Sequence, residues 1–121
     1  MNILLVDDSA AMRGIIRQAI KDNIVGRELN FFDAADGQQA LDQIKNNEID
    51  LIFLDWNMPV LDGLSFVKEL RSSGNSTPIV MITSITDEDK ILEAGKAGVN
   101  TYIEKPVRGN QLWEQIKEFI Q

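Results

Sequence analysis

The sequence contains no cysteine and no histidine. Without cysteine the chain can form no disulfide bond and can carry out no thiol chemistry. The absence of histidine removes the commonest general base, and the two absences together remove the usual ligands of zinc and copper. Any metal site in this protein must therefore be built from oxygen ligands, which suit a hard cation.

Long apolar runs and an excess of positive charge are also absent. No apolar run approaches the roughly 20 residues of a membrane-spanning helix. The chain opens at Met1 into a strand-like segment without a charged leader. The chain has 12 basic and 19 acidic residues, and the resulting net charge of -7 disfavours binding to nucleic acid or to anionic lipid. We therefore expect a cytoplasmic protein that binds neither nucleic acid nor membrane.

Short apolar runs alternate with helix-like segments over the whole chain of 121 residues, which has room for one domain, residues 1–121. The predicted strands are Asn2–Val6, Leu29–Phe32, Leu51–Leu54, Ile79–Ile82 and Thr101–Ile103. Apolar residues at helical spacing, expected to face the core, run from Met12 to Ile20, Ala40 to Ile44, Leu64 to Leu70, Ile91 to Gly95 and Leu112 to Ile120. The alternation predicts a doubly wound α/β fold with a five-stranded parallel sheet and five helices.

Punctuating residues agree with this alternation. The expected helix N-caps are Ser9, Asp36 and Thr86. Gly74 and Gly98 are expected to end helices. The acidic run 87–89 is interpreted as a solvated first helical turn.

Polar residues follow the predicted strands. They are Asp7 and Asp8, Asp33, Asp55, Thr83 and Ser84, and Lys105. Since the carboxyl ends of parallel strands share one edge, Asp7, Asp8 and Asp55 converge if the first and third strands are neighbours. Three carboxylates in one place repel unless a cation lies between them, and Mg²⁺ accepts such ligands. Lys105 is placed to pair with Asp55 or with an oxyanion attached to it.

Each of these features has an ordinary structural explanation when it is taken alone. Asp7 and Asp8 could form a turn and a helix cap, and Tyr102 could simply pack in a strand. Their joint placement at the ends of four strands favours a functional site. Asp33, which follows the outer second strand, keeps the structural interpretation.

The motifs ILLVDDS (3–9), LDWNMPVLDG (54–63), MITS (81–84) and YIEKP (102–106) occur in this order. In this combination the chain resembles the receiver domain of two-component response regulators, and especially the stand-alone chemotaxis regulators of the CheY type. The resemblance covers the whole chain. It implies a flavodoxin-like fold with strand order 2-1-3-4-5.

The resemblance implies that Asp55 is the phosphoacceptor. It also implies a Mg²⁺ site, open to Mn²⁺ as a substitute, made by Asp7, Asp8, Asp55 and the backbone carbonyl of Asn57. The phosphodonor would be a histidine kinase. The chain would then be a signalling protein and not an enzyme, although it would assist its own phosphorylation and dephosphorylation.

Further roles follow from the same resemblance. Thr83 and Lys105 would bind the phosphoryl group, and Thr83 with Tyr102 would form the conformational switch. Asn57 and Ile85 would modulate dephosphorylation. This chain has Ile85 where the chemotaxis regulator that it most resembles carries an acid, so the phosphoryl lifetime is expected to depend on this position.

The expected partner is a separate output protein. This partner would bind the face of the fourth helix, fifth strand and fifth helix of this chain, which comprises Ile91–Gly95, Asn100–Glu104 and Asn110–Phe119. By resemblance the partner would be a component of the flagellar motor switch. A phosphate sink or a receiver outside motility is the main alternative. An aspartate-based phosphatase is disfavoured by Asn57, where such enzymes use an acid. A flavodoxin-like carrier is disfavoured by Asp7 and Asp8, which would repel a flavin phosphate.

Overall fold

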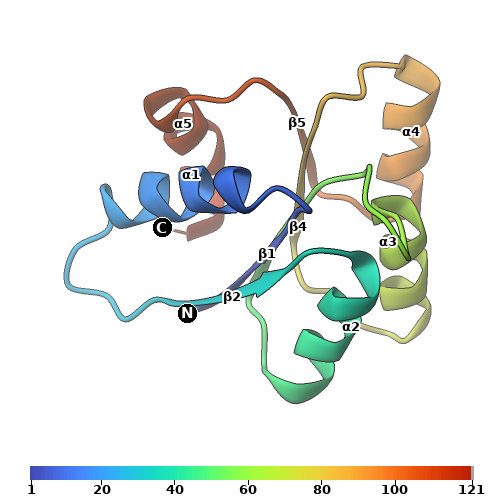
Figure 1. Cartoon of the computed structure of the whole chain (residues 1–121), viewed down its shortest axis with the longest axis horizontal. Coiled ribbons are helices and arrows are strands. Elements are labelled where there is room, and N and C mark those ends of the chain that lie inside the picture. The colour runs from blue at the N-terminus through green and yellow to red at the C-terminus, as the bar shows by residue number, and fades with distance from the viewer. Residues whose placement is uncertain (121) are drawn as a thin grey trace.

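The computed structural model describes residues 1–120, in which a five-stranded parallel sheet lies between two layers of helices (Figure 1). The strands are β1 (Asn2–Val6), β2 (Asn30–Ala34), β3 (Leu51–Leu54), β4 (Ile79–Thr83) and β5 (Thr101–Glu104). The helices are α1 (Ala10–Lys21), α2 (Gly37–Asn46), α3 (Gly63–Ser72), α4 (Glu88–Ala97) and α5 (Gly109–Ile120). The strand order is β2-β1-β3-β4-β5, which confirms the predicted fold class and topology.

The two helical layers each cover one face of the sheet. Helices α1 and α5 lie on one face, and α2, α3 and α4 lie on the other (Figure 1). In β3, Leu51 and Phe53 pack into the core below α1 and α5, whereas Ile52 and Leu54 pack into the opposite core. Because successive side chains of a strand point to opposite faces, a strand covered on both sides must be apolar throughout. Within residues 1–120, no helix has both the length and the hydropathy needed to cross a bilayer.

Two of the three predicted N-caps are confirmed. The side chains of Ser9 and Asp36 each accept a hydrogen bond from the N–H group three residues further on. The prediction for Thr86 is wrong, since Asp87 caps α4 and its carboxylate accepts from two N–H groups of the first turn. A carboxylate at this place is also favoured by the positive end of the helix dipole, which a hydroxyl is not. The other acids of the run 87–89 lie exposed in the first turn, as expected.

Glycines end two helices, and a third glycine allows a helix to begin close to the end of a strand. Gly74 and Gly98 have φ angles of 88° and 120°, which confirms them as helix stops. Gly63 opens α3 directly above the strand end, and its N–H donates to the carbonyl of Trp56 at 2.9 Å. A Cβ at position 63 would lie 2.2 Å from the backbone oxygen of Asp55. Only glycine allows α3 to start this close to the end of β3.

Strand β2 differs from its predicted range of 29–32. It pairs with β1 along its full length, from Asn2 opposite Asn30 to Val6 opposite Ala34. Asp33 therefore lies inside a strand and not after one, which corrects its predicted place. Backbone pairing with β1 sets the end of this edge strand, and a polar side chain is tolerated there because it faces solvent.

The apolar stripe predicted for α4, made by Ile91, Leu92 and Gly95, is at most half-buried. Leu92 is 61% exposed and Gly95 is exposed too, whereas the buried residue of this helix is Ala94, which lies outside the predicted set. In α1, Ile15 is likewise 42% exposed although it belongs to the predicted stripe. Helical spacing alone does not show how wide a face the sheet covers, so Leu92, Gly95 and Ile15 were wrongly assigned to the core.

Candidate functional site

The register of the central strands places two aspartates side by side. Val6 of β1 lies opposite Leu54 of β3, and Asp7 and Asp55 follow these two residues. The N–H of Asp55 donates to the carbonyl of Val6 at 2.9 Å. The backbone of Asp7 is held on its other side, where its N–H donates to Ala34 at 3.1 Å. Both carboxylates thus emerge at the carboxyl edge of the sheet, as predicted.

Asp8 completes a cluster of three carboxylates. Asp7, Asp8 and Asp55 each offer one oxygen, and these oxygens all lie within 4.8 Å of one another. Asp7 is 3% exposed and Asp55 7% exposed, whereas Asp8 faces solvent. The prediction that these three residues converge is confirmed. The cluster is half open, so that a small ion or group could reach it from the solvent.

Lys105 bridges the two buried members of this cluster. Its Nζ donates to Asp7 Oδ2 and to Asp55 Oδ2, at 3.0 Å in each case. Its backbone N–H is anchored on the carbonyl of Thr83 at 2.8 Å, and the Lys105–Pro106 peptide bond is cis. Burial alone would lower the pKa of Lys105, but hydrogen bonds to the two aspartates and their charges outweigh it and raise the pKa above its ordinary value.

Asp7 is the member of the cluster whose pKa is raised, mainly by burial. Burial raises its pKa above 3.8, against the hydrogen bonds from the Ser9 N–H and from Lys105 that favour the charged form. The nearby charge of Asp55 raises it further. The one ammonium group of Lys105 contacts two of the three carboxylates, so the cluster of three aspartates and one lysine keeps two uncompensated negative charges. An all-oxygen set with this excess of charge fits a hard divalent cation.

Asp55 is also held by the residue that follows it. The N–H of Trp56 donates to Asp55 Oδ1 at 2.7 Å, and the buried Trp56 belongs to the core on the side of the sheet that α2, α3 and α4 cover. The ammonium group of Lys90, in the first turn of α4, lies 5.8 Å from the centre of that ring. Sequence reasoning missed Lys90, because nothing in the sequence indicates which side chain of α4 lies over Trp56. Asn57, two residues after Asp55, is exposed.

Thr83, Ile85 and Tyr102 form a connected group beside the cluster. Thr83 is fully buried, and its Oγ1 accepts a long hydrogen bond of 3.4 Å from the N–H of Ile85. The hydroxyl of Tyr102 donates to the carbonyl of Ile85 at 2.8 Å. Burial raises the pKa of this hydroxyl, and the charges of Asp55 and Glu104 add to the effect. The half-buried Tyr102 ring therefore joins β5 to the loop between β4 and α4.

Asp33 lies outside the carboxylate cluster. Its carboxylate accepts two hydrogen bonds from Arg17, at 2.8 and 2.6 Å, and forms an ion pair with Arg13 at 3.3 Å. These contacts join β2 to α1. Asp33 therefore has a structural environment, in keeping with the interpretation from the sequence.

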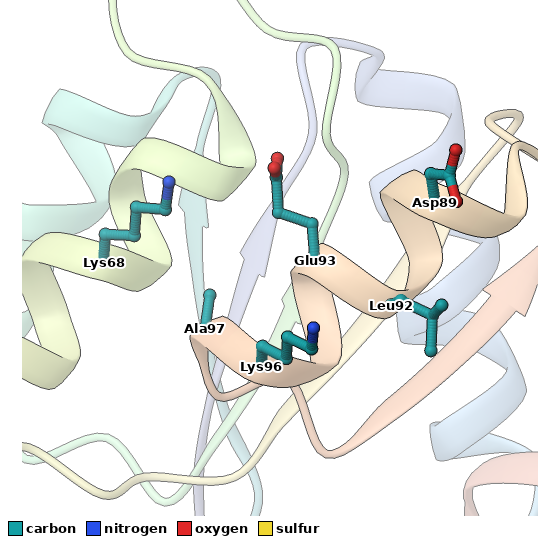
Figure 2. A pocket seen from close by; sticks show the side chains of 6 residues that line it. All are labelled: Lys68, Asp89, Leu92, Glu93, Lys96 and Ala97. Carbon is teal, nitrogen blue, oxygen red and sulfur yellow. The ribbon is translucent and has the colours of Figure 1, made fainter.

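A shallow depression of about 420 Å³ lies between α3 and α4, away from the carboxylates (Figure 2). Its lining residues are Lys68, Asp89, Leu92, Glu93, Lys96 and Ala97. Charges of both signs alternate around it, and Figure 2 shows Lys68 on α3 and Glu93 on α4 extending over the gap between the two helices. The depression contains none of the converging aspartates.

Comparisons with known proteins agree with this arrangement. The response regulator receiver domain family matches residues 3–117. The chain is 36% identical to the chemotaxis protein CheY-3 of Vibrio cholerae, over 100% of this chain and 92% of that protein. It is 35% identical to the cyclic di-GMP phosphodiesterase response regulator RpfG of Xanthomonas campestris, over 100% of this chain but 32% of that protein.

The fold is similar to solved structures of the same kind. A CheX-CheY complex with BeF3 and Mg²⁺ from Borrelia burgdorferi contains a chain that superimposes with a TM-score of 0.88 at 25% identity. The similarity covers 100% of this chain and 90% of that one. The similarity therefore extends over the sheet, its five helices and the edge where the aspartates meet.

Proposed function

Since the chain belongs to the response regulator receiver domain family, we propose that it accepts a phosphoryl group on Asp55 and thereby switches its binding to a separate protein. One observation carries the proposal: Asp7, Asp8 and Asp55 converge at the strand ends, with Lys105 bonded to two of them. The described residues 1–120 form one receiver domain in this proposal, and the chain is a signalling protein and not a classical enzyme.

A Mg²⁺ ion would be held by the carboxylates of Asp7, Asp8 and Asp55 and by the backbone carbonyl of Asn57, and Mn²⁺ would substitute for it. The residues fit such an ion because they supply only oxygen ligands and carry more negative charge than Lys105 neutralises. When bound, the ion would supply positive charge next to the phosphoryl oxygens. The Mg²⁺ in the Borrelia complex supports this assignment by similarity.

The proposed reaction uses a phosphohistidine of a histidine kinase as donor. A carboxylate oxygen of Asp55 forms a bond to phosphorus, the bond between phosphorus and the imidazole nitrogen breaks, and the imidazole leaves with the electron pair. Asp55 is held in place for this attack by the Trp56 N–H. Lys105, already bonded to Asp55, would then donate to the phosphoryl oxygens, and the buried hydroxyl of Thr83 would donate from the other side.

The switch would pass from Thr83 through Ile85 to Tyr102. A Thr83 hydroxyl that turns towards the phosphoryl group gives up its hydrogen bond from the Ile85 N–H, and Tyr102 is bonded to the carbonyl of the same residue. A few kcal/mol of differential contact is enough to shift such an equilibrium. The surface of α4, β5 and α5 would change, and a partner would bind there.

A flagellar motor switch component is the proposed partner, because relatives at 36% identity are chemotaxis proteins. The exposed Leu92 on α4 gives this face an apolar contact point. The match to RpfG supports a receiver outside motility as a second candidate. Binding of the purified chain to a motor switch protein, with and without a phosphodonor, distinguishes the two. We propose a cytoplasmic location for the chain, by similarity to its chemotaxis relatives.

The lifetime of the phosphoryl group would depend on Asn57 and Ile85. Asn57 is exposed and can hydrogen-bond the attacking water, whereas the half-buried Ile85 can only shield its approach. Ile85→Ala is expected to shorten the half-life up to about fivefold, which corresponds to about 1 kcal/mol of barrier. Ile85→Glu is expected to alter the half-life as well. Identical half-lives in all three proteins, measured in excess Mg²⁺ after donor removal, would exclude a role for this residue.

Labelling with acetyl phosphate tests the acceptor directly. Wild type should gain one phosphoryl group in the presence of Mg²⁺, and Asp55→Asn should gain none, because the amide keeps the shape but is no nucleophile. Asp42→Asn, at an exposed position of α2, is the matched control and should be labelled like wild type. Equal labelling of the Asp55 variant would show that another carboxylate is the acceptor.

A further inference from the structure

Arg13 reaches the backbone of the carboxylate cluster from the first turns of α1. Its guanidinium Nη1 donates to the backbone carbonyl of Asp7 at 2.5 Å. Its Nε forms the ion pair with Asp33 at 3.3 Å, and its side chain is only 17% exposed. One side chain thus joins the end of β1 to the edge strand β2.

The carbonyl that Arg13 contacts belongs to the peptide unit between Asp7 and Asp8. The orientation of this unit sets the directions in which both carboxylates leave the backbone. Three other contacts hold Asp7: its N–H on Ala34, and its carboxylate by the Ser9 N–H and by Lys105. The Asp7 carbonyl is the remaining polar group of this residue, and it accepts the hydrogen bond from Arg13.

We infer that Arg13 is a positioning residue for the Asp7 and Asp8 carboxylates, and that Asp33 acts by holding the Arg13 guanidinium in place. The inference rests on the proposed function, since it concerns the geometry of the proposed cation site. It gives Asp33 an indirect part in that site, although its own carboxylate lies outside the cluster. Partners that orient metal ligands commonly affect metal affinity about tenfold or more.

Arg17 provides a matched control within the same helix. It lies four residues after Arg13, bonds the same Asp33 carboxylate and packs over Phe31 at 5.6 Å, but no hydrogen bond joins it to Asp7. Substitution of either arginine by glutamine removes one positive charge and that arginine's contact to Asp33, which is two hydrogen bonds for Arg17 and one ion pair for Arg13. Only the substitution at position 13 also releases the Asp7 carbonyl.

The direction of the effect separates positioning from simple charge. If Arg13 acted only as a nearby positive charge, its removal would strengthen cation binding to the three carboxylates. If it positions Asp7 and Asp8, its removal should weaken binding in spite of this gain. Arg13→Lys keeps the charge but has one ammonium nitrogen in place of the planar guanidinium, whose separate nitrogens reach the Asp7 carbonyl and Asp33. It should therefore fall between wild type and Arg13→Gln.

The test is calorimetric titration of the full chain with MgCl₂, accompanied by Trp56 fluorescence, and thermal unfolding in EDTA. We expect Arg13→Gln to weaken Mg²⁺ binding about tenfold, Arg17→Gln to change it less than about twofold, and Asp33→Asn to lie between them. Both arginine variants should also lose stability without metal, since each loses its contact to Asp33. Mg²⁺ affinity of Arg13→Gln that equals or exceeds that of wild type, or equal losses of Mg²⁺ affinity in the two arginine variants, would overturn the inference. A wild type that does not bind Mg²⁺ would instead overturn the proposed function, and the inference with it.

Discussion

Helices α1 and α4 lie on opposite faces of one sheet, and they are anchored very differently. Helix α1 buries four residues, Met12, Ile16, Ala19 and Ile20, whereas α4 buries only Ala94. Arginines of α1 are paired with Asp33, but none of the ion pairs formed within residues 1–120 involves α4. The turn that carries Asp7 and Asp8 thus leads into α1, which has many buried contacts. The proposed output face includes α4, which has few.

This contrast separates two requirements of a phosphoryl switch. The acidic cluster needs carboxylates that stay in place, because charge stabilisation depends on fixed groups. The output face needs an element whose position can shift at small cost, and elements with few buried contacts open most easily. The polar contacts that join the α4 side to the site include the hydrogen bond of the Tyr102 hydroxyl to the Ile85 carbonyl, the long bond from the Ile85 N–H to Thr83, and the Lys90 ammonium group over the Trp56 ring.

The largest test of the contrast compares two truncations that remove the same number of carbon atoms. Ile20→Ala in α1 should lower the free energy of unfolding by about 2–5 kcal/mol, because the fully buried side chain leaves a cavity. Leu92→Ala in α4, at a side chain that is 61% exposed, should cost less than about 0.5 kcal/mol. Urea unfolding measures both values. Similar losses in the two variants would show that α4 is anchored as firmly as α1.

Metal binding at the carboxylate cluster should further raise the stability of the protein. A cation shared by the ends of β1 and β3 should raise the free energy of unfolding by about 1.4 kcal/mol at ten times its dissociation constant. Asp8→Asn should lose most of this gain, because it removes one proposed ligand at an exposed position. Thermal unfolding with EDTA or MgCl₂ measures the difference. A gain in the Asp8 variant as large as in wild type would place the cation elsewhere.

In the absence of metal, removal of one buried negative charge from the carboxylate cluster should stabilise the protein. Asp7→Asn keeps an acceptor for the Ser9 N–H but loses the charge, and should stabilise the metal-free protein at neutral pH by on the order of 1 kcal/mol. The pKa of Asp7 is raised in the folded state. Folding therefore favours its protonated form, and the contribution of Asp7 to stability is lost as the pH rises from about 3.8 through the raised pKa.

The pH profile decides whether this sign is right. The advantage of Asp7→Asn should be small below pH 3.8 and grow as the pH rises through the window above it. Denaturant unfolding in EDTA at a series of pH values measures this advantage. An Asn variant that is less stable than wild type at neutral pH would mean that the pairing of Asp7 with Lys105 outweighs its burial.

The smallest expected effect concerns the contact that holds the α4 side. Tyr102→Phe removes the hydrogen bond to the Ile85 carbonyl and should cost about 0.5–1 kcal/mol. Hydrogen exchange should become faster in residues 84–97, while the amides of α1 keep their wild-type rates. Uniform acceleration across both helices would contradict the idea that this bond controls the α4 side locally.

Local chemistry was readable from the sequence in most of the fold. Apolar runs and helical spacing predicted the five strands and five helices, because these patterns reflect backbone geometry that acts over a few residues. The order of strand-end residues, Asp7 and Asp8, Asp55, Thr83 and Lys105, indicated the site for the same reason. The resemblance then supplied the strand order and the roles that composition and spacing leave open.

The tertiary structure decided what depends on distance through space. The pairing of β2 with β1 placed Asp33 inside a strand, next to arginines of α1, and so connected it to the Asp7 carbonyl through Arg13. The limited cover over α4 left Leu92 exposed although its spacing is that of a core residue. The position of α4 on the sheet also placed the Lys90 ammonium group over the Trp56 ring. Such contacts join residues far apart in the chain, and they follow from how the helices pack on the sheet, which no local pattern of residues specifies.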